Sequence, residues 1–221
     1  MLEPIVLTWS GGKDSALALY YLKYSGQYQI TSLLTTITRD YDRISMHGVR
    51  RILVDSQAES LGLPLEEVFI SKNSSNEDYE NQMKDKLMFF QGQGVSSIAF
   101  GDLFLEDIRQ YREKNLSQVN MNGIFPLWGK DTHALAREFI ELGFQAVITC
   151  IDSQKLDKTF AGRYFDRRFL ADLPVDVDPC GENGEFHSFV FDGPIFKNPI
   201  SFKIGEVVIK EERFYFCDLL P

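Results

Sequence analysis

The chain has 221 residues, is 44% hydrophobic and carries a formal net charge of −9. This length suits one large domain with a smaller appendage, and an aromatic content of 13% argues against disorder over most of the chain. Because an acidic chain repels a phosphodiester backbone on average, the charge argues against nucleic acid as the main partner.

The cysteines and the N-terminus favour a cytoplasmic protein. Cys150, Cys180 and Cys217 are odd in number and form no Cys-x-x-Cys pair, which is poor material for a disulfide framework or a structural zinc site. The first residues lack a basic segment, and the apolar run at 5–7 is too short for a signal sequence. Since no stretch approaches the ~20 apolar residues of a membrane span, we expect no membrane partner.

Strand and helix patterns alternate over the first two thirds of the chain. Apolar and β-branched runs predict strands at 5–9, 30–37, 65–70, 97–101, 124–128 and 145–151. Amphipathic runs, several ending at glycine, predict helices at 16–24, 49–61, 77–90, 105–116 and 131–142. This order favours an α/β fold, in which helices cover both faces of a Rossmann-like parallel sheet.

The pattern changes after residue 152. The stretch 153–188 is mixed and rich in loops, and strands are predicted at 189–191, 200–204 and 207–216. We therefore expect two domains: an α/β domain over 1–151 and a smaller C-terminal α+β domain over 152–221.

A Ser-Gly-Gly-Lys-Asp-Ser string joins the first predicted strand to the first predicted helix. Its glycines permit a tight backbone, and its serines offer hydroxyl donors. Lys13 adds a positive charge where helix amides already favour anions, and Asp14 can cap the helix or help to hold Mg²⁺. Ligands of open α/β sheets bind at such strand ends. The predicted phosphate-binding residues are Ser10, Gly11, Gly12, Lys13, Asp14 and Ser15.

This loop is not of the Walker type, because Gly-x-x-x-x-Gly-Lys-Ser/Thr is absent. It resembles the PP-loop of the ATP pyrophosphatases, which are adenine nucleotide alpha hydrolase-like proteins with a HUP-type fold. Those enzymes cleave between the α- and β-phosphates, attach AMP to a substrate oxygen and release pyrophosphate. The resemblance implies that ATP and Mg²⁺ bind to the domain at 1–151.

Further segments resemble one branch of that superfamily, the diphthine–ammonia ligase family, which performs the last step of diphthamide synthesis. The resemblance runs from Val6 to about Ile200, and its most specific part is Gly-Glu-Asn-Gly-Glu-Phe at 181–186. Asn183 departs from the family, which usually has glycine there. With 221 residues the sequence resembles the compact prokaryotic form, so we expect none of the extra C-terminal domains of eukaryotic members. The other segments are 57–65, 101–102 with Arg109 and Arg112, 126–128 and 192–196.

The resemblance implies a two-step reaction. A substrate carboxylate attacks the α-phosphate of ATP, and ammonia then converts the acyl-adenylate into an amide and AMP. Lys13, Asp14, Glu182 and Glu185 are the predicted catalytic residues. The two glutamates would orient a cationic acceptor, hold ammonium or accept a proton, or else only bind backbone amides of a tight loop. The acceptor is diphthine-modified elongation factor 2 or a small carboxylate, since some bacterial members occur in organisms that lack diphthamide.

The remaining predicted contacts have plain structural alternatives. Asp102 would bind Mg²⁺ together with Asp14, or would only cap a helix. Arg109 would contact the substrate or only pair with Glu113, and the Trp128 ring would face a cationic acceptor or belong to the core. Thr35, Thr36, Gly101 and Asp102 are predicted nucleotide contacts; Arg109, Trp128, Gly181, Glu182, Asn183, Gly184 and Glu185 are predicted substrate contacts.

Three other functions compete with the ligase. A PP-loop enzyme acting on tRNA commonly needs paired cysteines and a basic face, and the sequence shows neither. An amidotransferase needs a glutaminase domain, for which there is no room, so free ammonia is implied. A nucleotide-binding protein without turnover is disfavoured by the intact Lys13-Asp14-Ser15 string and the elaborate C-terminal part.

Overall fold

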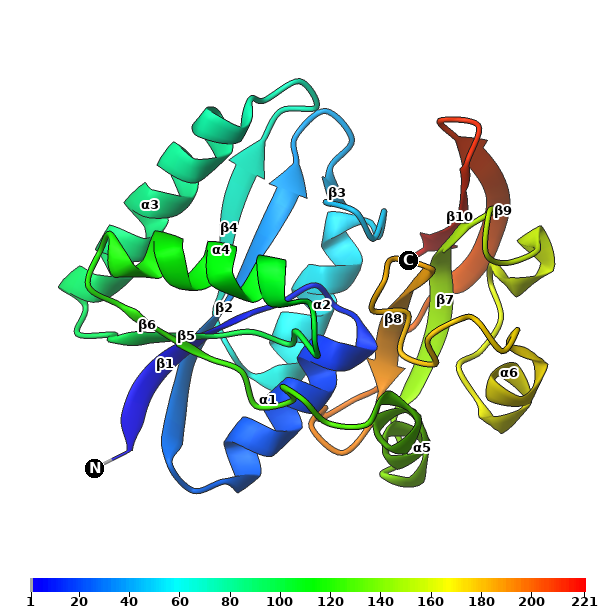
Figure 1. The fold of residues 1–221 in the computed structure, drawn as a ribbon, viewed down its shortest axis with the longest axis horizontal. Helices are drawn as coiled ribbons and strands as arrows, with labels where there is room; N and C mark the ends of the chain where they lie inside the picture. The colour runs from blue at the N-terminus through cyan, green and yellow to red at the C-terminus, as the bar shows by residue number, and fades with distance from the viewer. Residues whose placement is uncertain (1) are drawn as a thin grey trace.

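The structure, a computed structural model, describes residues 2–221 and contains two β-sheets (Figure 1). In the first sheet, β1 (Glu3–Thr8) pairs in parallel with β2 (Tyr28–Thr38) on one side and with β5 (Ser97–Ala99) on the other. β4 (Leu65–Ile70) continues the parallel sheet beyond β2, and β6 (Asn122–Ile124) continues it beyond β5. The short β3 (Arg43–Ile44) pairs antiparallel with the end of β2.

Helices connect the parallel strands and cover both faces of this sheet. α1 (Lys13–Tyr24) and α2 (Arg51–Leu61) lie on one face, while α3 (Asn76–Gly92) and α4 (Glu106–Ser117) lie on the other (Figure 1). Side chains of a strand alternate between faces, so Leu7 packs in the core with α1 and α2, whereas Val6 packs with α3 and α4. The predicted Rossmann-like fold class is confirmed. Within residues 2–221, no helix has the length and apolar character needed to cross a membrane.

The chain reverses its direction across the sheet after β4. It moves outward from β1 through β2 to β4 and then returns to the other side of β1 to form β5 and β6. Ligands of such sheets bind outside the carboxyl ends of the strands, at the crevice where the order reverses. In this chain the crevice lies between the ends of β1 and β5.

The second sheet is antiparallel, with the strand order β8-β7-β10-β9. Its strands are β7 (Gln145–Asp152), β8 (Phe186–Asp192), β9 (Lys203–Lys210) and β10 (Phe214–Leu220). α5 (Thr132–Glu141), a 3-10 turn (Lys158–Phe160) and α6 (Arg167–Asp172) accompany it. The predicted strand at 145–151 exists, but it pairs antiparallel with β8 and β10 instead of extending the parallel sheet. A fully buried strand reads as one apolar run in either kind of sheet. The predicted division of the chain at 151 and 152 stays a prediction.

The predicted single strand at 207–216 is wrong, because the chain turns back within it. Glu211 and Glu212 both adopt a φ of 52°, and the Arg213 amide donates to the Lys210 carbonyl at 3.1 Å. This turn contains none of the glycine, asparagine or proline residues that usually mark a hairpin. With no turn signal in the sequence, the continuous hydrophobic pattern led to the prediction of one strand where the structure has two, β9 and β10.

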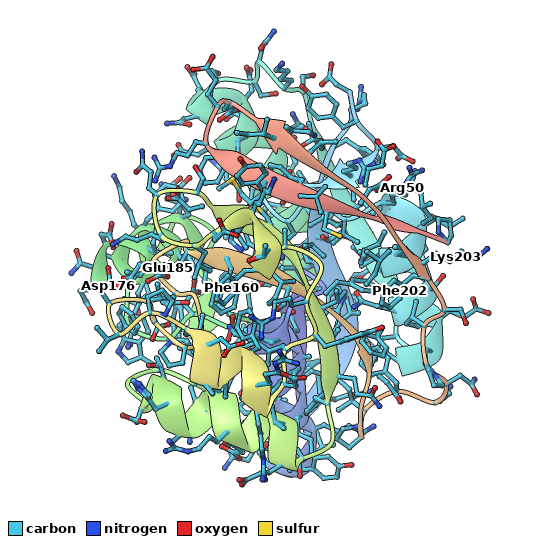
Figure 2. The ribbon with its side chains drawn as sticks, turned by 90° about the vertical axis from the view of Figure 1, so that its right-hand side faces the viewer. Arg50, Phe160, Asp176, Glu185, Phe202 and Lys203 are labelled. Atoms are coloured by element: carbon cyan, nitrogen blue, oxygen red, sulfur yellow. The ribbon has the colours of Figure 1, made fainter. Side chains whose placement is uncertain are left out.

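An ion-pair cluster ties β10 to the first sheet. The Asp218 carboxylate accepts hydrogen bonds from Arg43 at 2.9 Å and from Arg50 at 2.7 and 3.1 Å. The hydrogen bond from Arg50, with Arg43 adding to it, lowers the pKa of Asp218 to about 2. In Figure 2 Arg50 lies on the same side of the molecule as Lys203, at one end of the outer hairpin.

We expect Asp218→Asn to lower the free energy of unfolding by about 1–2 kcal/mol at neutral pH, because two arginines lose their shared carboxylate. Since the pKa of Asp218 is lower in the folded than in the unfolded chain, the stabilisation is present above pH ~4 and disappears as pH falls toward 2. Denaturant titrations of both proteins at several pH values measure this. A stability difference that stays constant from pH 7 to pH 2 would contradict the assignment.

Candidate active site

The loop after β1 is held in shape by its own serines. The Ser10 hydroxyl accepts a hydrogen bond from the Gly12 amide at 3.2 Å, and the Ser15 hydroxyl donates to the Gly12 carbonyl at 2.9 Å. Gly11 adopts a φ of 77°, which favours glycine. The structure thus brings the predicted phosphate-binding residues into one tight turn at the start of α1.

The N-terminus of α1 faces the crevice between β1 and β5. Gly12 precedes the helix and offers no side-chain cap, and Ser188 accepts from the Lys13 amide, so the amides of Asp14 and Ser15 are left for other acceptors. A Cβ atom on Gly101, which follows β5, would stand 3.0 Å from the Ser15 nitrogen and 3.0 Å from the Asp14 carbonyl carbon. Gly101 therefore lets the β5 end approach the helix start closely, and the open amides suit an anion.

A fully buried glutamine supports the loop from behind. Gln57 of α2 accepts from the Trp9 indole at 2.9 Å and donates to the carbonyls of Gly11 at 3.0 Å and Val190 at 2.6 Å. β8 adds two more contacts, since Val190 donates its amide to Gly11 at 2.9 Å and the Ser188 hydroxyl accepts from the Lys13 amide at 3.1 Å. The second sheet is therefore part of the wall of the phosphate loop.

Lys13 and Asp14 form a close ion pair at the corner where the start of α1 meets the end of β5. The Lys13 ammonium lies 2.7 Å from both carboxylate oxygens of Asp14, and the lysine is 4% exposed. Burial lowers the pKa of Lys13, but the charge of Asp14 and its hydrogen bond to the lysine outweigh this and hold the pKa above its usual value. The lysine is therefore a fixed cation beside the open helix amides.

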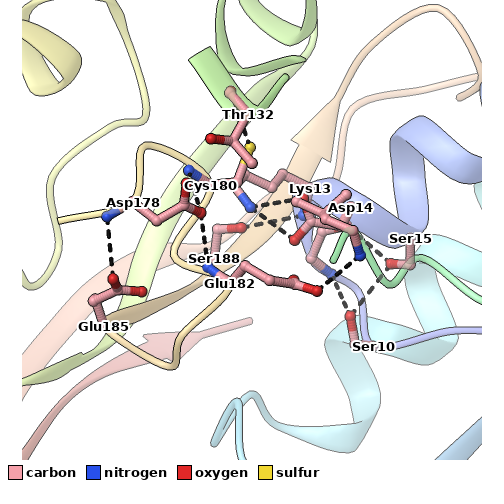
Figure 3. Close-up of polar contacts among 12 residues, drawn as sticks. Ser10, Lys13, Asp14, Ser15, Thr132, Asp178, Cys180, Glu182, Glu185 and Ser188 are labelled. Atoms are coloured by element: carbon pink, nitrogen blue, oxygen red, sulfur yellow. Dashed lines mark hydrogen bonds and ion pairs between the residues drawn. The ribbon is translucent and has the colours of Figure 1, made fainter. Parts of the chain in front are cut away.

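Glu182 reaches this corner from the C-terminal part of the chain (Figure 3). Its carboxylate accepts from the Leu103 amide at 2.7 Å, which joins the loop after β5. Burial raises the pKa of Glu182 to about 7, and the nearby charges of Asp14 and Asp102 act in the same direction. A carboxyl group that titrates near neutrality can give or take a proton at working pH.

Glu185 instead organises its own loop (Figure 3). Its carboxylate is 2% exposed and accepts from the amides of Asp178 at 3.1 Å and Asn183 at 3.0 Å. The Asn183 side chain donates to the same carboxylate at 3.0 Å. Gly181 and Gly184 adopt φ values of 69° and 85° in this turn. These contacts match the alternative in which the glutamate binds backbone amides, and its catalytic role stays a prediction.

Two histidines lie on the other side of the loop. The ring centres of His47 and His187 lie 4.4 Å apart with their planes tilted by 33°, and the His47 ring would lie 3.1 Å from a Cβ atom on Gly12. Burial lowers the pKa of His47 to about 4, and burial together with the charge of Lys13 holds the pKa of His187 well below its usual value. Both imidazoles are therefore neutral at pH 7.

Comparisons with known proteins agree along most of the chain. Residues 3–122 match the diphthamide synthase N-terminal domain, and residues 131–218 match the diphthamide synthase C-terminal domain. The chain belongs to the diphthamide synthase family. The family predicted from the sequence is thereby confirmed, as is an enzyme of the ligase type.

Curated relatives of the diphthamide synthase family are similar over about nine tenths of the chain. Human diphthine–ammonia ligase is 27% identical, over 90% of this chain and 83% of its own length. The zebrafish (Danio rerio) enzyme is 26% identical, over 92% of this chain and 88% of its own length. The Schizosaccharomyces pombe enzyme is 24% identical over 90% of this chain, which spans only 36% of the length of that relative.

A solved structure, the U34-tRNA thiolase NcsA from Methanococcus maripaludis, is similar at a TM-score of 0.38 and 19% identity. The match covers 64% of this chain and 57% of that one.

Other residues predicted from the family resemblance lie in varied settings. Asp102 follows β5 and pairs with Arg112 at 2.8 Å. Arg109 pairs with Glu113 at 2.9 Å, and its guanidinium lies 4.7 Å from the centre of the Trp128 ring. That ring therefore already faces a cation of the same chain. The substrate-binding roles of Arg109 and Trp128 stay predictions.

Thr35 lies in β2, directly before Thr36 and near the carboxyl end of the strand. Thr35 is 3% exposed, and its hydroxyl has no hydrogen-bond partner among the described residues. An unpaired buried hydroxyl costs free energy unless a ligand or water reaches it. A nucleotide contact at Thr35 and Thr36 therefore stays a prediction. The unpaired hydroxyl of Thr35 favours it.

The cysteines take no part in this corner as nucleophiles. All three thiols are free and buried. Burial raises the pKa of Cys180 to about 12, although its sulfur lies close enough to Lys13 to feel that charge. The thiol is therefore protonated at neutral pH and a poor nucleophile.

The sequence interpretation missed Gln57, Ser188 and His187 as parts of the site. Gln57 lies in a segment that resembles the family, but a glutamine in an amphipathic helix carries no signal of its own. Ser188 and His187 lie in a strand far along the chain. Only the packing of the second sheet on α1 brings them to the phosphate loop.

Proposed function

We propose that the chain is an ATP-dependent ligase, which adenylates a substrate carboxylate and then joins ammonia to it as an amide. One observation carries the proposal: residues 181–186, here called the acceptor segment, place Glu182 beside Lys13 and the open amides of α1. The phosphate loop and the acceptor segment are thus two halves of one site. The curated relatives named diphthine–ammonia ligase support this chemistry.

In the first step, the chain would bind the triphosphate against the α1 amides and Lys13. The carboxylate oxygen of the acceptor attacks the α-phosphorus, the bond to the bridging oxygen breaks, and pyrophosphate leaves with the electron pair. Lys13 and the loop amides stabilise the negative charge that builds up on the phosphate oxygens. Because Lys13 is buried and already paired with Asp14, it needs little reorganisation to do so.

Mg²⁺ is the proposed metal. It is usually held by one or two carboxylates together with substrate phosphates, so a cluster of three protein ligands is not required. Asp14 and Asp102 fit this donor set, since Asp102 directly follows Gly101, on which a Cβ atom would lie only 3.0 Å from the Asp14 carbonyl carbon. When bound, the ion would neutralise phosphate charge.

In the second step, ammonia attacks the acyl carbon and AMP leaves. At neutral pH ammonium must first lose a proton. Glu182 is the proposed base, because it lies at the corner, is half-buried and titrates near pH 7. The acceptor is diphthine-modified elongation factor 2 or a small carboxylate, and the partners are ATP and ammonia.

A pyrophosphate-release assay tests the proposal. The protein, ATP, Mg²⁺ and ammonium are incubated with modified elongation factor 2, with small carboxylates or with tRNA. We expect pyrophosphate and AMP in equal amounts, only when a carboxylate acceptor is present. Replacing ammonium by hydroxylamine should trap the acyl-adenylate as a hydroxamate. Release that depends on tRNA would favour a tRNA-modifying enzyme, and nucleotide binding without release would favour a non-catalytic nucleotide-binding protein.

A further inference from the structure

β9 is an open edge of the second sheet. It hydrogen-bonds to β10 on one side, and no strand among residues 2–221 pairs with its other side. Four of its apolar side chains are 42–51% exposed: Ile204, Val207, Val208 and Ile209. Unpaired backbone groups beside exposed β-branched side chains form a template for a further strand.

The residues of this edge are self-complementary about Val208. Glu206 and Lys210 lie two residues before and after it, and Val207 and Ile209 lie one residue before and after it. Glu206, Val208 and Lys210 line one hollow beside Phe216 and so share one face, although the pairing of β9 with β10 shifts by one residue between Ile204 and Val207. Val207 and Ile209 alternate with them and share the other face. An identical strand running the opposite way, centred on the same valine, would meet opposite charges on one face and apolar groups on the other.

We propose that two copies of this chain pair antiparallel through residues 206–210 of β9, which joins their second sheets across a two-fold axis. Glu206 then lies opposite the partner's Lys210, Val208 opposite the partner's Val208, and Val207 opposite the partner's Ile209. Opposite charges and β-branched pairs at directly opposed positions stabilise antiparallel strands. A two-fold axis produces each of these contacts twice, apart from the central valine pair.

A two-fold axis opposes only side chains that lie on the same face, so the register must be centred on one residue. Centring it on Val207 would place Glu206 opposite the partner's Val208 and leave the charge without a partner, so charge favours the register centred on Val208. The contacts of Lys210 agree with the choice. Its ammonium lies 5.0 Å from the ring centre of Tyr41 and 5.1 Å from that of Phe216, so it is held on the face that Glu206 shares.

The opposite edge of the sheet is closed to such pairing. Val190 of β8 donates its amide to Gly11 of the phosphate loop, and its carbonyl accepts from Gln57. β9 runs along the outside of the molecule instead (Figure 2), far along the sheet from β8. A second copy can therefore bind at β9 without touching the phosphate loop.

A charge exchange tests the proposal by light scattering and sedimentation of the full chain. Wild type should form a dimer whose fraction rises with concentration. Glu206→Lys and Lys210→Glu each place like charges opposite one another twice, and each should raise the dimer dissociation constant at least about tenfold. The double variant carries the same net charge as wild type and restores both pairs with their signs exchanged. It should recover most of the affinity.

Lys203→Glu is the matched control, because it changes the charge of the same strand outside the paired segment and should leave the dimer intact. Hydrogen exchange of wild type gives a second readout that needs no variant: protection of the amides at 206–210 should rise with protein concentration. A wild type that stays monomeric, single variants that dimerise as well as wild type, or a double variant that does not recover would each overturn the proposal.

Discussion

Replacing Lys13 with alanine is expected to lower kcat/KM for pyrophosphate release by at least about 10²–10³-fold, as the loss of one preorganised charge-stabilising group does elsewhere. The structure makes the effect larger than the loss of an exposed lysine would be. Lys13 is 4% exposed and neutralises Asp14, so its removal leaves carboxylates at the place where the phosphates must bind. Repulsion then adds to the lost attraction, and both KM for ATP and kcat should suffer.

Lys23→Ala is the matched control for this experiment. Lys23 lies in the last turn of the same helix and is exposed, so its loss changes the net charge equally without reaching the crevice. Circular dichroism and thermal unfolding establish whether Lys13→Ala keeps the fold, and Lys13→Met preserves more of the buried volume if it does not. Turnover by folded Lys13→Met equal to that of wild type would remove the lysine from the proposed mechanism.

The phosphate loop could be predicted because its signal is local. Glycines, serines and a lysine between an apolar strand and a helix specify both the turn and the anion that suits it. The same holds for the alternation of strands and helices through β6, since each element shows its own periodicity. The order of elements therefore predicts that the loop lies at the carboxyl end of a parallel strand, where ligands of such sheets bind.

The rest of the site depends on contacts between distant segments, which no local pattern encodes. β7 was predicted as a strand, but nothing in its run of buried residues says that its partners are β8 and β10. The support of Gly11 by Gln57 and Val190 follows only from that pairing. Local sequence also cannot separate Glu182 from Glu185, which lie three residues apart in one loop. Tertiary packing places the Glu182 carboxylate against the Leu103 amide after β5, whereas the Glu185 carboxylate accepts from the Asn183 amide of its own loop.

That difference between the two glutamates predicts opposite phenotypes for the same chemical change. Glu182→Gln keeps the shape of the side chain and removes its ability to take a proton, so we expect the amidation rate to fall by about 10²-fold or more. The Leu103 amide keeps an acceptor, which argues against a large loss of stability. Glu185→Gln instead loses a buried carboxylate that accepts from backbone amides, and should cost about 1–3 kcal/mol of stability.

The pH dependence decides whether Glu182 acts as a base. Because burial raises its pKa to about 7, the group is protonated and inactive below that pH and ionised above it. The ratio of the wild-type rate to the Glu182→Gln rate should therefore rise as pH increases through about 7 and level off above. Taking the ratio cancels the titration of ammonium, which both proteins share. A ratio that stays flat from pH 5.5 to 8.5 would show that Glu182 does not act as a base. If the ratio of the wild-type rate to the Glu185→Gln rate were pH-dependent instead, Glu185 would be the base and Glu182 the structural residue.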